Sequence, residues 1–120
     1  MTNTQDFLDD VKEEIKDFII ENSTYLAVGT SATAATPAQT SLLTETNRKA
    51  RQEYTEGTSD VVVSLFLGTT DNNGEDLTEV GVLNASSTGN MMMRATYPAI
   101  SKTVSIDLWI DVEEQVDVVQ

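Results

Sequence analysis

The chain has 120 residues, of which 20 are acidic and seven are basic, so its formal net charge is −13. This length suits one domain with a hydrophobic core. Cysteine and histidine are both absent, which excludes disulfides, Ser-His and Cys-His nucleophile pairs and the usual zinc ligands. The acidic balance argues against nucleic acid and anionic membranes as partners, because both are bound by basic surfaces.

The acidic residues are spread along the chain, with seven in residues 6–21, eight in 45–79 and five in 107–117. Two explanations compete for such a charge. Either the protein binds something cationic, or it lives where salt screens the repulsion, the Debye length being about 3 Å at 1 M. A cation-binding patch would be local, whereas these acids are dispersed and lysines are few. The pattern therefore favours a halophile's protein.

Residues 5–21 have a helical pattern, which Thr4 or Asn3 can cap. Its apolar residues recur at steps of three, four and three, and two more widen the stripe: Leu8, Val11, Ile15 and Phe18, with Phe7 and Ile19 beside them. A lone helix of this length is marginal in water, so the stripe must pack on its own domain or on copies of itself. We expect residues 1–22 to form an assembly arm and residues 23–120 a β-sandwich domain.

Strand patterns follow this helix. The expected strands are separated by a loop of small residues at 30–41, a short helical or irregular turn at 42–46, an Asn73-Gly74 hairpin signal and a polar turn at 85–89. They cover residues 24–29, 48–55, 61–67, 77–84, 90–97 and 103–112. Pro98 is expected to end the fifth of them. The sequence thus predicts a mainly β protein, an antiparallel β-sandwich of about six or seven strands with one N-terminal amphipathic helix.

The last expected strand has one face that is entirely apolar. Its core face should carry Val104, Ile106, Leu108 and Ile110. Trp109 then lies on the opposite face, where a neighbouring chain, the helix or a ligand could cover it.

Little in the sequence points to catalysis or to metal binding. Carboxylate pairs are the remaining catalytic candidates, Glu45 with Glu53 or Glu75 with Glu79, and we expect all of these to be solvated surface acids. One ion site is conceivable, with calcium held by oxygens of the turn residues Asp71, Asn73, Glu75 and Asp76. The spacing departs from the helix-loop-helix calcium pattern, so a plain hairpin turn is the better interpretation. We expect no cofactor and no enzymatic activity.

Two long runs resemble a known family. They read YLAVGTSATAATPAQTSLLTETNRKA, from residue 25, and LTEVGVLNASSTGNMMMRATYPAISKT, from residue 77. They resemble a small β-sandwich protein of tailed viruses of bacteria and archaea, described as a tail-fibre-like or minor structural protein. Family members carry a strand like LAVGTGTTA, a TxLxxExxR stretch and a hairpin of the form TEVGLFNA…GGTMLARATFPPIxKT. The positions that match the hairpin are Glu79, Gly81, Asn84, Gly89, Met91, Arg94 and Pro98.

The resemblance implies a structural virion protein without enzymatic activity, in the tail, baseplate or fibre region. The acidic surface suggests a virus of a halophilic archaeon. Its expected partners are copies of itself, other virion proteins and a host surface receptor. A capsid decoration or turret protein and a receptor- or carbohydrate-binding module are the alternatives. The expected oligomer interface comprises Leu8, Val11, Ile15, Phe18, Met92 and Trp109.

Two features of the hairpin run carry structural expectations. Gly81 lies within an apolar strand, where a glycine permits a bulge, a close backbone approach or a large side chain opposite, for which we expect Trp109. The second feature is a row of three methionines, in which Met92 should face opposite to Met91 and Met93.

Overall fold

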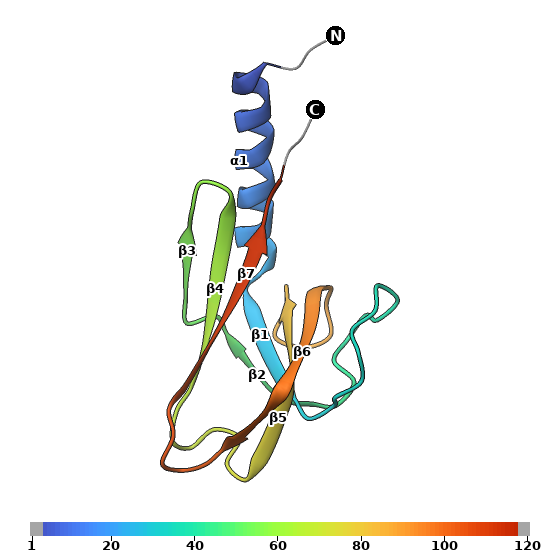
Figure 1. Ribbon diagram of the computed structural model, residues 1–120, viewed down its shortest axis with the longest axis vertical. Helices are drawn as coiled ribbons and strands as arrows, with labels where there is room; N and C mark the ends of the chain where they lie inside the picture. Colours follow the sequence, from blue (N-terminus) through green and yellow to red (C-terminus); the bar gives the residue numbers. More distant parts are fainter. Residues whose placement is uncertain (1–3, 118–120) are drawn as a thin grey trace.

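One helix precedes seven strands in the computed structural model, which describes residues 4–117. The elements are α1 (Gln5–Asn22), β1 (Tyr25–Gly29), β2 (Glu45–Ala50), β3 (Glu53–Glu56), β4 (Asp60–Leu67), β5 (Glu75–Leu83), β6 (Met91–Lys102) and β7 (Leu108–Gln115). They form two antiparallel sheets, of order β2-β1-β5-β6 and β3-β4-β7, with α1 at one end of the molecule (Figure 1). The predicted β-sandwich with one N-terminal helix is confirmed.

The main core lies between the two sheets. It is built from alternate residues of the central strands, which side chains from α1 and from the edge strands extend. Its buried members are Leu26, Val28, Val61, Val63, Leu65, Leu67, Leu77, Val80, Val82 and Val112. Burial of such apolar surface is the main favourable contribution to folding.

Helix α1 is capped at both ends. The Thr4 side chain accepts a hydrogen bond from the Phe7 backbone N–H, while Asn3, the other expected cap, lies outside the described residues. No basic residue lies in the last turn. Instead, the Arg51 guanidinium reaches across from the β2–β3 link and donates to the carbonyls of Ile20 and Ser23. A cation there stabilises the negative end of the helix dipole.

Within residues 4–117, no helix is long and apolar enough to span a membrane.

Three strand predictions need correction. The expected strand 48–55 is two strands, because the chain leaves one sheet after Ala50 and enters the other at Glu53. Pro98 lies inside β6 rather than at its end. The ladder skips from the Leu77–Ile100 pair to the Glu79–Thr96 pair, so Pro98 occupies a bulge and needs no ladder N–H.

The third correction concerns residues 103–112. The expected strand begins only at Leu108, after a turn in which the Ile106 N–H donates to the Thr103 carbonyl. Val104 and Ile106 therefore lie outside the core, and Val104 is 65% exposed. The strand instead buries Val112 and half-buries Leu108 and Ile110. The apolar residues continue to alternate through this turn, and a two-residue period alone does not distinguish such a turn from a strand.

The outer face of the four-stranded sheet has its own small core. Ala27, Leu42 and Leu83 are buried there, with Met91 packed against them. Leu42 comes from the long connection between β1 and β2, most of which is exposed, and it anchors that connection on this face. The contacts that hold the connection on this face define the candidate site.

Candidate functional site

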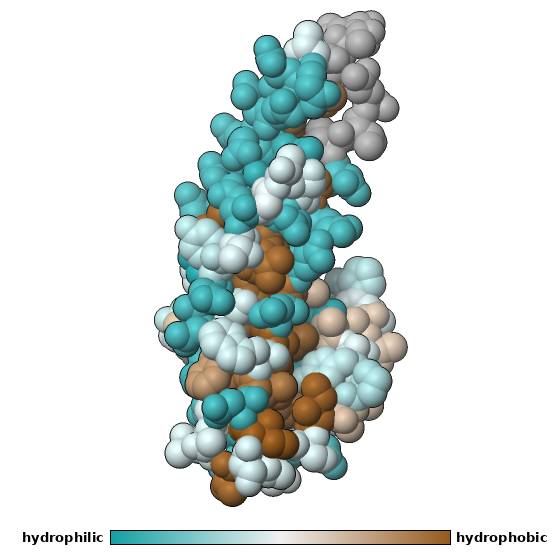
Figure 2. Space-filling model, turned by 60° about the vertical axis from the view of Figure 1, so that its left-hand side comes forward, coloured by the Kyte–Doolittle hydropathy of each residue, from teal (hydrophilic) through white to brown (hydrophobic). Residues whose placement is uncertain are grey.

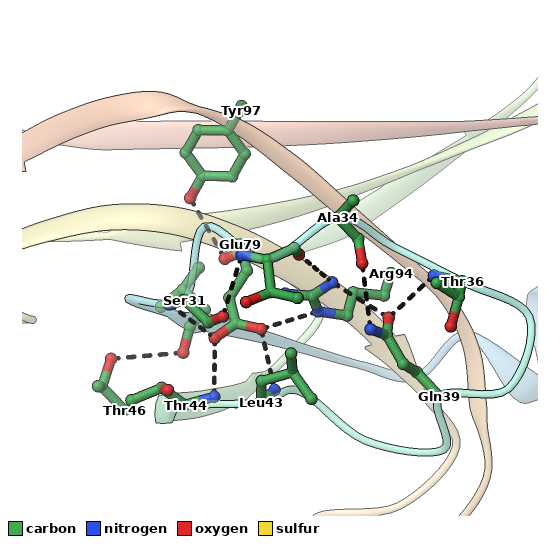
Figure 3. A network of polar contacts seen from close by, with 12 residues as sticks. Ser31, Ala34, Thr36, Gln39, Leu43, Thr44, Thr46, Glu79, Arg94 and Tyr97 are labelled. Carbon is green, nitrogen blue, oxygen red and sulfur yellow. Dashed lines mark hydrogen bonds and ion pairs between the residues drawn. The ribbon is translucent and has the colours of Figure 1, made fainter.

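A buried carboxylate lies beneath the β1–β2 connection. Glu79, on β5, has no exposed surface, and each of its oxygens accepts two hydrogen bonds. Oε1 accepts from the Leu43 N–H at 3.1 Å and from Arg94 Nε at 2.9 Å. Oε2 accepts from the N–H groups of Ser31 at 3.1 Å and Thr44 at 2.9 Å (Figure 3). These four donors fill the acceptor positions of a carboxylate. The expectation that Glu79 is a solvated surface acid is wrong.

Arg94, on β6, completes the network. Its position follows from the register, which pairs Gly81 with Arg94 and so sets Arg94 diagonally beside Glu79 on the outer face. Besides Glu79, the guanidinium donates from Nη1 to the Thr33 carbonyl at 2.8 Å and to Gln39 Oε1 at 3.1 Å. One ion pair therefore fastens both ends and the middle of the β1–β2 connection (Figure 3).

The chemistry of this pair is structural. Burial alone would raise the pKa of Glu79, but the Arg94 guanidinium and three backbone N–H groups hold that pKa below its ordinary value. A carboxylate that is ionised and fully hydrogen-bonded has no free position from which to take a proton. Tyr97 donates to the Glu79 carbonyl at 3.4 Å, and burial raises the pKa of this phenol to about 12. The other pair of candidates, Glu45 and Glu53, lies exposed on strands of different sheets.

Gly81 is needed because of Leu42. A Cβ atom built on Gly81 would lie 2.8 Å from Leu42 Cδ2 and 3.4 Å from Met91 Sδ, so the expected close approach exists but involves a different side chain. Trp109 lies on β7 in the other sheet and packs on Phe66, with ring centroids 5.0 Å apart. Our assignment of Trp109 as the residue over Gly81 is therefore wrong. Trp109 remains 49% exposed.

The predicted hairpin turn is present between β5 and β6. Asn84 closes it, because its side chain accepts from the Asn90 N–H at 2.8 Å and its own N–H donates to the Asn90 carbonyl. Gly89 has φ +76°, and a Cβ there would lie 2.6 Å from Asn84 Oδ1. Arg48 on β2 donates to the carbonyls of Ala85 and Thr88 across the sheet. The turn is thus held at both sides.

The three methionines do not alternate as expected. Met91 packs in the outer core, but Met92 and Met93 both pack against the main core. The register shifts there, because Val82 pairs with Met93 and Leu83 with Met91, which leaves Met92 as the extra residue of a bulge. Met92 is half-buried in its own domain, so the expected interface loses this residue as an outward anchor.

The apolar stripe of α1 is divided between two faces. Leu8 is 8% exposed and lies on the side that also buries Lys16, so it is not available to another subunit. Phe7, Ile15 and Phe18 are 53%, 39% and 59% exposed. With Val11, Asp10 and Glu14 they line a shallow groove of about 610 Å³, which we call the helix groove. Of the expected interface on α1, Val11, Ile15 and Phe18 thus face outward.

Lysine contacts explain this rotation of the helix. Lys16 Nζ donates to the Gly57 carbonyl at 2.9 Å and pairs with Glu13 and Glu56. The hydrogen bond to Glu13 raises the pKa of this ammonium group, with Glu56 adding to the effect and partial desolvation opposing it. Lys12 Nζ donates to the Ser59 hydroxyl at 3.1 Å. The helix therefore docks its lysine side on the β3–β4 turn, and within residues 4–117 the side with Phe7, Ile15 and Phe18 stays exposed.

All seven basic residues, like Lys12 and Lys16, donate hydrogen bonds to other residues of the fold. Each is buried or half-buried, whereas fifteen of the twenty acidic residues are exposed. Six of the seven donate to a backbone carbonyl, and Lys12 is the exception. Exposed side chains of the described residues therefore carry negative charge almost alone.

The calcium candidates already have protein partners. Asp71 accepts from Lys49 Nζ at 2.9 Å and from the Gly68 N–H, which together hold the pKa of Asp71 below its ordinary value. Asn73 accepts from Lys102 Nζ at 3.2 Å, and Asp76 accepts from the Ser101 hydroxyl at 2.7 Å. Glu75 accepts from the Asn72 amide. Two lysine ammonium groups thus occupy the position of a cation in this turn, which favours a plain turn over an ion site. The hairpin predicted from Asn73-Gly74 is wrong, because this turn joins β4 to β5 and the two strands lie in different sheets.

No family model matches the chain, and no curated protein is similar enough to be counted as a relative.

Proposed function

We propose that this chain is a structural, non-enzymatic protein of a tailed virus that infects a halophile. It assembles as an oligomer in the tail, baseplate or fibre region of the particle. The observation that carries the proposal is the helix groove: an 18-residue helix with two phenylalanines more than half exposed. An apolar face of this kind on a water-soluble surface marks an interaction site.

Two further observations support the proposal. The hairpin run that resembles the viral family uses its Glu79 and Arg94 to fasten the β1–β2 connection, which makes a rigid block rather than an open cleft. The exposed side chains carry acids almost without bases, which suits concentrated salt, where the repulsion between neighbouring subunits is screened.

The experiment is to locate the protein in particles. Antibodies against the recombinant chain are applied to gradient-purified virus from the strain that encodes it, and bound gold is imaged by electron microscopy. We expect gold at the tail or its base, at a constant copy number per particle. Gold on the capsid surface would favour a decoration or turret protein, and its absence from intact and partly disassembled particles would refute the virion role.

A receptor-binding module is the second candidate, and Trp109 is the residue that favours it. Its indole is 49% exposed beside Phe66, as an aromatic platform for a sugar or a receptor side chain would be. Trp109→Ala separates the candidates. Loss of host attachment by particles of normal composition supports binding, whereas loss of the oligomer supports an interface.

A further inference from the structure

A second exposed apolar patch lies at the end of the molecule opposite the helix groove. The β6–β7 connection and the β4–β5 turn lie together at the lower end in Figure 1, and α1 forms the upper end, along a long axis of 56 Å. Val104 is 65% exposed, with Ile106 at 37% and Ile100 at 36%, and we call these three residues the apolar tip. In Figure 2 hydrophobic side chains run through the middle and lower parts of the visible face, while the visible upper end is mostly hydrophilic.

Charge distinguishes the two patches. Helix α1 carries seven acidic residues, and two of them, Asp10 and Glu14, line its groove. Residues 80–106 contain no acidic residue, and they include the whole apolar tip. Two carboxylates flank the tip: Asp107 follows Ile106 in the chain, and Asp76 pairs with Ser101, which is next to Ile100.

Two copies of the chain could pair groove to groove or groove to tip, and the two arrangements differ in electrostatic repulsion. Pairing groove with groove would bring four carboxylates into one interface, because each groove is lined by Asp10 and Glu14, and it would set two acidic helices side by side. Little positive charge is available to offset them, because every basic residue is buried or half-buried and hydrogen-bonded within its own chain. Pairing groove with tip places the apolar faces together and keeps the two acidic helices apart. Like-charge juxtaposition opposes the first arrangement far more than the second.

We infer that copies of this chain associate head to tail, the helix groove of one copy receiving the apolar tip of the next. The inference rests on the proposed function, because it specifies how the oligomer is built. A groove-to-tip contact is heterologous, so repeated contacts close into a ring or continue as a filament. Each contact is small and flanked by acids, so it requires high protein concentration and salt near 1 M, where the Debye length is about 3 Å.

The test uses the full chain and two single substitutions at exposed positions. Ile15→Asp disables the groove, Val104→Asp disables the tip, and Ser87→Asp adds the same charge in the β5–β6 turn as the matched control. Circular dichroism first confirms that each variant has the wild-type melting transition. Sedimentation velocity in about 2 M sodium chloride then gives the mass of each protein and of a 1:1 mixture of the groove and tip variants.

We expect concentration-dependent oligomers from the wild type and the control, and monomers from each disabled variant alone. The mixture should form dimers and nothing larger, because it offers one intact groove and one intact tip per pair. If Val104→Asp assembles like the wild type while Ile15→Asp does not, the contact is groove to groove and the inference is overturned, although an oligomeric virion protein stands. A wild type that stays monomeric overturns the inference too, and particle labelling then decides the virion role independently.

Discussion

Replacing Glu79 with glutamine should remove a large share of the protein's stability. The amide keeps one carbonyl oxygen and so can satisfy two of the four donors that converge on Glu79. The other two face an NH₂ group, and the buried Arg94 loses its counter-charge. Each buried donor left unsatisfied costs about 1–3 kcal/mol, and breaking a buried ion pair costs about 3–5 kcal/mol in total. A loss of about 4 kcal/mol is most of the margin of a weakly stable domain.

Thermal and urea unfolding in high salt measure this loss. For a chain of this size the melting temperature should fall by roughly 10–20 °C. Glu113→Gln is the matched control, since it makes the same chemical change at an exposed position on β7 and should shift stability by less than about 0.5 kcal/mol. Hydrogen exchange should accelerate at the Leu43 and Thr44 amides, which donate to Glu79. A Glu79→Gln protein that melts within about 3 °C of the wild type would refute the reasoning.

Three more predictions follow from the same structure. Gly81→Val should lower the free energy of unfolding by about 1–3 kcal/mol, because the valine overpacks against Leu42. Urea unfolding should show that the double variant with Leu42→Ala recovers part of this loss. A Gly81→Val protein as stable as the wild type would contradict the close approach. The pKa of Glu79 is lower in the folded protein than in the unfolded chain. Its contribution to the free energy of unfolding is therefore complete above the ordinary pKa near 4.5 and is lost as the pH falls through the pKa of the folded state. The stability difference between wild type and Glu79→Gln should therefore shrink below about pH 4.5, and a constant difference down to pH 3 would count against an ionised Glu79. Thermal unfolding should lose cooperativity below roughly 0.5 M salt through unscreened repulsion, so a sharp transition in dilute buffer would argue against halophily.

The sequence predicted the elements well where the spacing of the apolar residues and the residue types of the turns indicated the same element. Residues 5–21 have one clear helical period, and the helix spans Gln5–Asn22. The hairpin from Leu77 onward was predicted from its apolar runs and polar turn, and the structure places Asn84 and Gly89 at that turn. These features depend on residues close in the chain, which is why a sequence can reveal them.

The sequence pattern could not reveal features that depend on contacts between residues far apart in the chain. The outward face of α1 depends on Lys16, whose partners Glu56 and Gly57 are forty residues away. Burial of Glu79 depends on donors from the β1–β2 connection. One signal for it was available: a lone acid in the apolar run LTEVGVL, with an arginine on the strand expected to pair with it. The hairpin register brings the two together on one face, and a buried acid needs such a partner.

The use of every basic residue inside the fold has a consequence for proteolysis. Trypsin cleaves only after lysine and arginine, and six of its seven sites lie within α1, β2 or β6, while Arg51 lies in the two-residue link after β2. The acidic loops and turns, where proteases usually cut first, offer it no substrate. Tryptic digestion of this protein therefore proceeds only as fast as its helix and sheets open, and its rate becomes a direct measure of their unfolding.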